Sequence, residues 1–223
     1  MMPRSSAKMA SFSSSVVLLM KTAAIVLAAG KSERMRQNKL LLRLNDTTLI
    51  DNILDAVAAA NIDETIVVLG HKPEQIIEAT QPRREAVKTA INKDFERGMI
   101  SSFQKGLQML PSVDAAFLIL GDEPILDNNF LNAMIQHMEN SRGRALLVSP
   151  IHKGKKGHPL LVHRQLFSEI LDLEKTETMR DIIRRHADRL LTIAAPEWTI
   201  MDIDTPEDYT RIHSLMNSSS HGH

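Results

Sequence analysis

A short basic loop directly after an apolar run carries the residues whose chemistry stands out first. The apolar run covers residues 23–28 and ends at Ala29 and Gly30, and the following loop contains Arg34 and Lys39. Residues without a bulky side chain let the backbone come close to a ligand. Free N–H groups in such a turn form a concave anion site, to which lysine and arginine add charge. The stretch therefore predicts a site for a polyphosphate.

An acidic residue follows a second apolar run. Residues 115–120 are almost wholly apolar, which is typical of a central strand in a parallel sheet. Asp122 comes directly after this run, between Gly121 and Glu123. Open α/β sheets bind ligands beyond the carboxyl ends of their strands, and Mg²⁺ takes one or two carboxylates together with phosphate oxygens. Asp122 is therefore the first candidate for a metal ligand, with a turn-forming aspartate before proline as the alternative.

Strand and helix patterns alternate along the chain, and these elements must position the loop and Asp122. Strands are expected at residues 23–28, 64–69, 87–91, 115–120, 144–149 and 190–194, with a further short apolar run at 40–44. Helices are expected to begin near Thr48, Pro73, Ser101, Asp127, Leu166, Met179 and Thr205. Such alternation indicates parallel βαβ units. We therefore expect one α/β domain with a mostly parallel sheet.

The composition of the 223 residues narrows the class of protein. Lys plus Arg and Asp plus Glu both number 27, so no basic excess favours sequence-independent nucleic-acid binding. Cysteine is absent, which excludes disulfides and thiolate-bound metals and fits a reducing compartment. No apolar run approaches the length that spans a bilayer. We expect a cytoplasmic protein with no nucleic-acid and no membrane partner.

Both ends of the chain are expected to lie outside the folded domain. Residues 1–19 are rich in serine and lack helical or strand periodicity, and Met20 looks like a natural start. A secretory signal would need a longer apolar core, and an organellar transit peptide is the other interpretation. We predict a disordered extension at 1–19, one folded domain at 20–216 and a disordered tail at 217–223.

The basic loop and four later segments together resemble the signature motifs of the MobA-like nucleotidyltransferases. The loop reads Leu27-Ala28-Ala29-Gly30-Lys31-Ser32-Glu33-Arg34-Met35-Arg36-Gln37-Asn38-Lys39, and the family pattern is L-A-A/G-G-x-S-x-R-M-G-x-x-K. Arg36 stands where the family usually has glycine. The later segments are GMISSFQKGL from Gly98, GDEP from Gly121, GHP from Gly157 and DIDTPED from Asp202. The first of these is similar to the cytidylyltransferase branch of the family.

The resemblance implies a role for each motif. The catalytic residues would be Arg34, Lys39 and Asp122. The residues that would bind the nucleotide are Leu27, Ala28, Ala29, Gly30, Lys39, Gly70, Ser101 and Ser102. The acceptor would contact Gly157, His158 and Pro159, and Mg²⁺ would be held by Asp122 and Asp202, with Asp204 as the weaker candidate. The alternatives are that Ser101 only caps a helix and that His158 makes a structural hydrogen bond.

The resemblance also implies a fold and a reaction. The fold is that of the nucleotide-diphospho-sugar transferases, a single-domain, doubly wound, Rossmann-like α/β sandwich. The enzyme would use Mg²⁺, and a phosphorylated acceptor would attack the α-phosphate of a nucleoside triphosphate and release pyrophosphate. Ala29, the serine pair and the GHP segment resemble the branch that joins CMP from CTP to molybdenum cofactor. The partners implied are CTP, a molybdopterin-type acceptor, and a molybdenum hydroxylase apoenzyme or its chaperone.

Other functions stay open at this point. Within the same class, the chain could be a guanylyltransferase for the same cofactor, or a cytidylyl- or uridylyltransferase for a sugar or polyol phosphate. From another class, it could be a maturation chaperone for molybdenum hydroxylases that binds nucleotide without turnover, and Arg36 keeps this alternative open. An oxidoreductase would require a dinucleotide fingerprint, which the sequence lacks.

Overall fold

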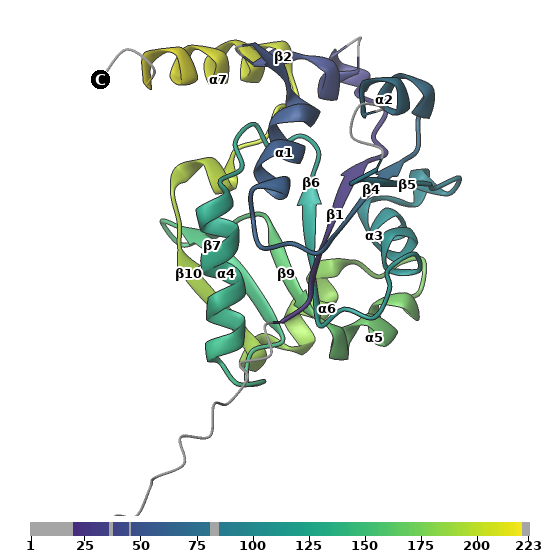
Figure 1. Ribbon diagram of the computed structural model, residues 1–223, viewed down its shortest axis with the longest axis vertical. Helices are drawn as coiled ribbons and strands as arrows, with labels where there is room; N and C mark the ends of the chain where they lie inside the picture. The colour runs from purple at the N-terminus through teal and green to yellow at the C-terminus, as the bar shows by residue number, and fades with distance from the viewer. Residues whose placement is uncertain (1–19, 36–37, 45, 81–84, 220–223) are drawn as a thin grey trace, which may run out of the picture.

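An open, mixed sheet runs through the centre of the domain (Figure 1). Its strands are β1 (Thr22–Ala28), β4 (Glu64–Leu69), β5 (Lys88–Ile91), β6 (Ala115–Leu120), β7 (Leu147–His152), β8 (Lys155–Lys156), β9 (Leu160–His163) and β10 (Leu190–Ala194). Their order is β10-β7-β9-β6-β1-β4-β5, with β8 paired to β7. β9 is antiparallel to both neighbours, and the other pairs within that order are parallel. The mostly parallel α/β sheet predicted from the sequence is confirmed.

The computed structural model describes residues 20–35, 38–44, 46–80 and 85–219. The extension predicted at 1–19 lies outside these residues, as does Arg36, the position at which the loop departs from the family pattern. None of the helices in the described ranges combines the length and the apolar character that crossing a bilayer requires.

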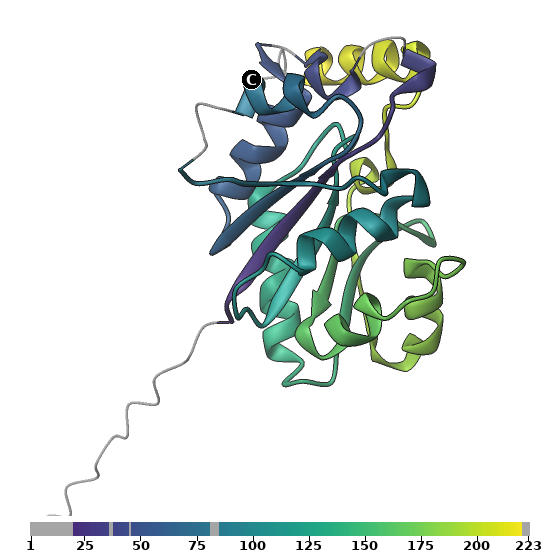
Figure 2. The same ribbon diagram turned by 90° about the vertical axis from the view of Figure 1, so that its right-hand side faces the viewer.

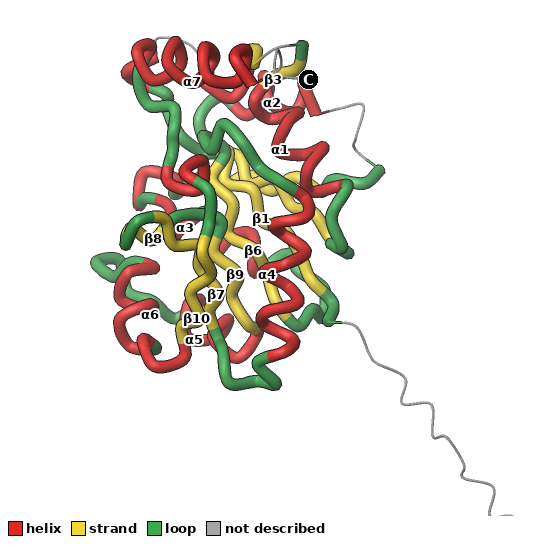
Figure 3. The backbone as a smooth tube through the Cα atoms, turned by 90° about the vertical axis from the view of Figure 1, so that its left-hand side faces the viewer, coloured by secondary structure: helices red, strands yellow, loops and turns green. Residues whose placement is uncertain are grey.

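Helices cover both faces of the sheet. They are α1 (Leu49–Ala58), α2 (Pro73–Thr80), α3 (Met99–Leu107), α4 (Asn128–Asn140), α5 (Phe167–Leu171), α6 (Met179–Arg185) and α7 (Pro206–Ser219). α1 and α4 pack on one face against Val26 and Phe117, whereas α3, α5 and α6 pack on the other against Ile25 and Leu118. Figure 2 views this second face, and Figure 3 shows the strands between the two helical layers. The doubly wound architecture is confirmed.

Burial on both faces explains why the central strands are apolar at every position. Successive strand residues point to opposite faces, so a strand between two helical layers has no solvent side. In β1, Ala24 and Val26 face one layer, and Ala23 and Ile25 face the other. All four are 0% exposed. Burial of a side chain the size of isoleucine contributes about 1.5–3 kcal/mol, so these positions fix the register of the strand.

The strand order reverses beside β1. After β1 the chain builds β4 and β5 on one side, and it then returns to place β6 on the other side. Both neighbours of β1 are parallel to it, so the three strands end at the same edge of the sheet. Open α/β sheets bind ligands at such a switch point. The loop after Ala28 and the turn after Leu120 are therefore brought together (Figure 1).

Several elements differ from the predictions, and β9 (Leu160–His163) lies in a stretch for which no strand is predicted. Residues 40–44 form a 3₁₀ turn, Lys39–Leu41, before β2 (Arg43–Leu44), which pairs with β3 (Thr47–Thr48). The strand predicted from residue 144 begins at Leu147, because Gly143, at φ +79°, and neighbouring residues form a turn after α4. α7 continues to Ser219, beyond the domain boundary predicted at 216. Extension of an existing helix costs little, since each added residue brings its own hydrogen bond.

A Gly106→Ala substitution is expected to destabilise the fold. A Cβ atom at Gly106 in α3 would lie 2.4 Å from Ile25 Cγ2 in β1. Overpacking costs about 1–3 kcal/mol, whereas alanine gains about 1 kcal/mol over glycine within a helix. We therefore expect a lower urea midpoint than for the wild type and for Lys105→Ala, the control at the neighbouring helical position. A variant as stable as the wild type would show that α3 moves away from β1 at no cost.

Candidate active site

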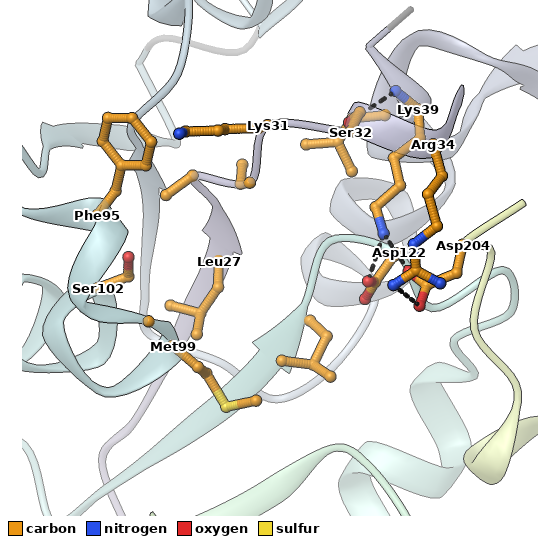
Figure 4. Close-up of a pocket in the computed structure, with 16 residues that line it drawn as sticks. Leu27, Lys31, Ser32, Arg34, Lys39, Phe95, Met99, Ser102, Asp122 and Asp204 are labelled. Carbon is orange, nitrogen blue, oxygen red and sulfur yellow. Dashed lines mark hydrogen bonds and ion pairs between the residues drawn. The ribbon is translucent and has the colours of Figure 1, made fainter. Parts of the chain in front are cut away.

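A cavity of about 430 Å³ opens at the edge where β1 and β6 end (Figure 4). Nine residues from the predicted site line it: Leu27, Ala28, Ala29, Gly30, Arg34, Lys39, Ser102, Asp122 and Asp204. One end of the cavity carries Arg34, Lys39, Asp122 and Asp204. The other end is mainly apolar, with Leu27, Phe95 and Met99, and the Lys31 side chain extends toward Phe95 there. The structure thus brings the basic loop and Asp122 together as the sequence predicts.

Lys39 links two carboxylates at the charged end. Its Nζ lies 2.7 Å from Asp122 Oδ2 and 3.0 Å from Asp204 Oδ1. Arg34 approaches the same group from solvent, with Nη2 3.4 Å from Asp204 Oδ2. Burial acts to lower the pKa of Lys39, but the two carboxylates outweigh this effect and the pKa is raised. Lys39 therefore keeps its positive charge inside the cavity.

The backbone of the loop holds Lys39 in place. Ser32 adopts a left-handed conformation, with φ 53°, and its Oγ accepts a hydrogen bond from the Lys39 N–H at 3.2 Å. Positive φ is uncommon for residues other than glycine and is found at functional sites. Asn38 caps the turn that follows, because its Oδ1 accepts from the Leu40 N–H. The loop thus turns back on itself and directs Lys39 inward.

The segment before α7 brings a second acid to Asp122. The Ile203 N–H donates to the backbone oxygen of Asp122 at 3.1 Å, which ties this segment to the end of β6. Asp204 lines the cavity, whereas Asp202 does not. The sequence favours Asp202 over Asp204 as a metal ligand, and the structure instead places Asp204 in contact with Lys39.

The acids at this end suit a divalent cation whose coordination shell is completed by a substrate phosphate. Within the described ranges, no three histidine or acidic side chains form a ready-made metal cluster. Mg²⁺ commonly takes one or two carboxylates and fills its other positions with water and substrate phosphate. Partial burial raises the pKa of Asp202, and the charges of Asp204 and Asp122 raise it further. This crowding of negative charge is what a bound dication would relieve.

Two glycines let the neighbouring strands approach the end of β1. Gly70 follows β4, and a Cβ atom there would lie 2.7 Å from Ala29 O and from Phe95 Cβ. Gly121 follows β6, and a Cβ atom there would lie 2.7 Å from Leu27 O. Gly70 is predicted to bind nucleotide, but it does not line the cavity. Its place in the structure is a packing position behind the loop that follows β1.

The two serines at the start of α3 differ in position. Ser102 lines the cavity, whereas Ser101 lines a separate hollow on the outer side of α3. The N-cap of α3 is Gly98, at φ 89°, so Ser101 is not the cap. The Ser101 hydroxyl instead lies 2.8 Å from Gly98 O, inside the first turn. Ser101, which the sequence predicts to bind nucleotide, therefore does not face the cavity.

The predicted acceptor segment lies near the cavity but does not line it. Gly157 packs against Thr199, because a Cβ atom there would overlap Thr199 O at 2.0 Å. The His158 N–H donates to the same oxygen at 2.8 Å, and the peptide bond to Pro159 is cis. His158 Nδ1 is buried and has no hydrogen-bond partner in the described part of the chain. The segment therefore has both a structural backbone contact and an unused ring nitrogen.

Stability is expected to fall at acidic pH through His158. Burial lowers its pKa, and the nearby charge of Asp122 offsets this only in part. The His158 imidazole therefore binds a proton more readily in the unfolded chain than in the folded protein. Its contribution to the free energy of unfolding is present above the ordinary pKa of about 6.5 and is lost as pH falls through the pKa of the folded protein. The urea midpoint should fall between neutral and acidic pH in both proteins, and the fall should be smaller for His158→Gln than for the wild type. An NMR titration that puts the His158 midpoint at or above its ordinary value would contradict this prediction.

The sequence analysis assigns no role to seven residues of the cavity wall: Lys31, Ser32, Leu40, Phe95, Gly98, Met99 and Leu120. Asp204, its weaker candidate for a metal ligand, also lines the cavity. Gly98 and Met99 belong to the motif that carries the two serines, so their proximity could have been inferred from that motif. Phe95 belongs to no recognised motif, and the sequence holds no signal for it. Its ring closes the apolar end of the cavity opposite Leu27 (Figure 4).

The fold and the site together define a class of enzyme. An open, mostly parallel sheet presents a basic loop and two carboxylates at its switch point, an arrangement suited to transfer reactions of nucleoside triphosphates. A family model described as the MobA-like NTP transferase domain matches residues 24–190. The chain belongs to this family and is a nucleotidyltransferase.

Individual relatives agree with this assignment. The chain is 26% identical over 185 residues to the molybdenum cofactor cytidylyltransferase of Escherichia coli K12, a match that covers 83% of this chain and 92% of that protein. It is 30% identical over 147 residues to the bifunctional protein GlmU of Bifidobacterium adolescentis, covering 63% of this chain but only 32% of GlmU. A Mycobacterium tuberculosis H37Rv protein solved in complex with manganese has a TM-score of 0.68 at 22% identity, covering 87% of this chain and 99% of that chain.

Proposed function

We propose that this nucleotidyltransferase joins CMP from CTP to a phosphorylated acceptor of the molybdopterin type, with Mg²⁺ as the metal. The observation that carries the proposal is the similarity to the molybdenum cofactor cytidylyltransferase, which extends over 92% of that relative. The match to GlmU has a higher identity but spans about a third of that longer protein, at 32%. A cytoplasmic location, and contact with a molybdenum hydroxylase or its chaperone, belong to the same proposal.

The two ends of the cavity suit the two ends of a nucleotide. Arg34 and Lys39 carry the positive charge that a triphosphate needs, and they lie at the same end as Asp122. The opposite end, with Leu27 and Phe95, offers apolar surface to a base. Between them, the backbone at Ala29 and Gly30 can come close to the ligand. This arrangement supports a nucleotide that spans the cavity, with its phosphates toward Lys39.

The reaction requires positioning and charge rather than a general base. An oxygen of the acceptor phosphate forms a bond to the α-phosphorus of CTP. The bond from that phosphorus to the bridging oxygen breaks, and pyrophosphate leaves with the electron pair. Arg34 and Lys39 would stabilise the charge that grows on the leaving phosphates. The attacking phosphate is already ionised, so its orientation beside the α-phosphate is the main contribution of the site.

Asp122 and Asp204 would hold the metal, with Asp202 as the third nearby acid. When bound, Mg²⁺ supplies positive charge that neutralises the triphosphate oxygens and polarises the bond to be broken. The neighbour of this fold that was solved with manganese supports the use of a divalent cation.

The acceptor is proposed to approach from the side of Gly157, His158 and Pro159. Two observations support this direction. The charge of Asp122 affects the pKa of His158, so the segment lies close to the charged end of the cavity. The adjoining β7–β8 hairpin also exposes three lysines that would attract an anionic acceptor: Lys153, Lys155 and Lys156.

Base choice and acceptor are tested together in one competition. CTP and GTP are offered with molybdenum cofactor and Mg²⁺, and the dinucleotide formed is identified. Ala29 lines the cavity and its methyl group reduces the room beside the base, so we expect CTP to be preferred at least about tenfold in kcat/KM. Predominantly guanine dinucleotide would overturn the base choice, and activation of a sugar phosphate instead would overturn the acceptor. Absence of pyrophosphate release with every acceptor tried would favour the non-catalytic chaperone, whereas steady release with any acceptor would eliminate it.

A further inference from the structure

The buried side-chain amide of Asn92 lies behind the cavity, and the transfer reaction described above does not use it. Asn92 follows β5 and is 5% exposed. Its Oδ1 accepts a hydrogen bond from the Asp94 N–H at 2.9 Å, which fixes which end of the amide is oxygen. Its Nδ2 therefore donates both hydrogens, to Ser101 Oγ at 2.9 Å and to Ser102 Oγ at 3.0 Å. The amide is fully satisfied and its orientation is set by the backbone.

The two serine hydroxyls are consequently left in different states. Each Oγ accepts from Asn92, so each hydroxyl hydrogen must point elsewhere. Ser101 Oγ has carbonyl acceptors, with Gly98 O at 2.8 Å and Asp94 O at 3.1 Å. Ser102 Oγ has no acceptor among the described residues, and its side chain lines the cavity beneath Phe95 (Figure 4). A serine hydroxyl has a single hydrogen to donate, and that of Ser102 is available to the cavity.

We infer that Ser102 donates a hydrogen bond to an acceptor atom on the base of the bound nucleotide, and that Asn92 is the positioning residue that makes Ser102 a donor. The inference rests on the proposed function, because it places the base at the apolar end of the cavity. The ligand atom recognised is a carbonyl oxygen or an unprotonated ring nitrogen. An amino group in the same place is itself a donor, so the amino group and the Ser102 hydroxyl would both lack an acceptor. Ser101 contributes to the turn and not to the ligand.

Reversal of the hydrogen-bond direction tests this arrangement. Asn92→Asp is nearly isosteric, but a carboxylate accepts where the amide donates. Both serine hydroxyls would then donate to the carboxylate, and Ser102 would lose its hydrogen bond to the base. We expect Asn92→Asp and Ser102→Ala each to weaken CTP binding about tenfold by calorimetry at neutral pH. The double variant should bind no worse than either single variant, because both changes remove the same hydrogen bond.

Ser101→Ala is the matched control. Ser101 accepts from the same Asn92 amide, but its own hydrogen is directed at Gly98 O. We expect this variant to bind CTP as the wild type does, even where its melting temperature falls. In turnover assays, Ser102→Ala should raise KM for the nucleotide and leave kcat nearly unchanged. A residue with a purely structural role would not separate the two parameters in this way.

The outcomes separate this inference from the proposed function. Equal weakening by Ser101→Ala and Ser102→Ala, or additive losses in the double variant, would overturn the inference while CTP binding by the wild type stands. If Asn92→Asp does not fold, the comparison of the two serine variants decides alone. If the wild type binds another nucleoside triphosphate in place of CTP, the proposed base choice fails. The same variants then test Ser102 with that nucleotide.

Discussion

An Asp122→Asn variant is expected to lose turnover by about a hundredfold or more and to keep its fold. The carboxylate stands at the end of the central strand β6, within the charged end of the cavity. Asparagine keeps the shape of the side chain but loses the negative charge that a metal ligand supplies. The backbone oxygen of residue 122 can still accept from the Ile203 N–H, so the local structure should persist. Pyrophosphate release at saturating CTP, with the acceptor and Mg²⁺ present, measures the loss.

Asp114→Asn is a suitable control for this variant. Asp114 precedes the other end of β6 and pairs with Arg164 at 3.5 Å, away from the cavity. Turnover should be retained there. Activity of Asp122→Asn within a few-fold of the wild type would mean that the metal is held by other groups. Asp202→Asn and Asp204→Asn, assayed in parallel, would then show which acid matters, and we expect the larger loss for Asp204→Asn.

A Lys39→Met variant is expected to change two properties in opposite directions. Turnover should fall by about a hundredfold, because the charge that stabilises the leaving phosphates is removed. Metal binding to the nucleotide-free protein should become stronger. The Lys39 ammonium lies within 3.0 Å of both Asp122 and Asp204, between the carboxylates that a dication would use. A metal ion that arrives without nucleotide must displace this ammonium, whereas a triphosphate gives the ammonium another partner.

Titration with Mn²⁺ in the absence of nucleotide measures this second effect. Binding to Lys39→Met should be tighter than to the wild type by at least about tenfold. Lys88→Met is the control, since Lys88 pairs with Glu64 on the sheet at a distance of 2.7 Å, outside the cavity. An unchanged Mn²⁺ affinity for Lys39→Met would show that the ammonium does not compete with the metal.

The parts of the fold that could be predicted are the elements whose burial is evident from their local amino-acid composition. β4 and β6 have the predicted bounds, because strands covered on both faces must be continuously apolar. The start of α1 was equally clear, since Thr48 accepts from the Asp51 N–H as an N-cap. The family motifs likewise identified the loop from Leu27 to Lys39, because phosphate-binding loops need particular residues at fixed spacing.

The parts that could not be predicted depend on contacts between distant segments. Phe95 joins the cavity only because the turn after β5 folds over the end of β1. Which of Asp202 and Asp204 lines the cavity depends on the backbone hydrogen bond between Ile203 and Asp122, which no local sequence pattern predicts. The sequence predicts a nucleotide contact for Gly70, and it gives no sign that a Cβ atom there would lie 2.7 Å from Ala29 O.

The bridge from Lys39 to Asp122 and Asp204 also has a consequence for the order of folding. Its contact with Asp204 joins residues 165 positions apart in the chain, farther apart than Thr22 and Ala115, which pair where β1 meets β6. Closure of such long loops is slow, and local contacts form first. A refolding chain can therefore complete much of its sheet before the charged end of the cavity exists. The single tryptophan, Trp198, lies just before the segment that carries Asp204. Its ring packs edge-on against Phe130, with 5.4 Å between the two ring centroids. Its fluorescence thus reports when that late segment docks, and catalytic competence should appear with this signal and not with the earlier gain of secondary structure.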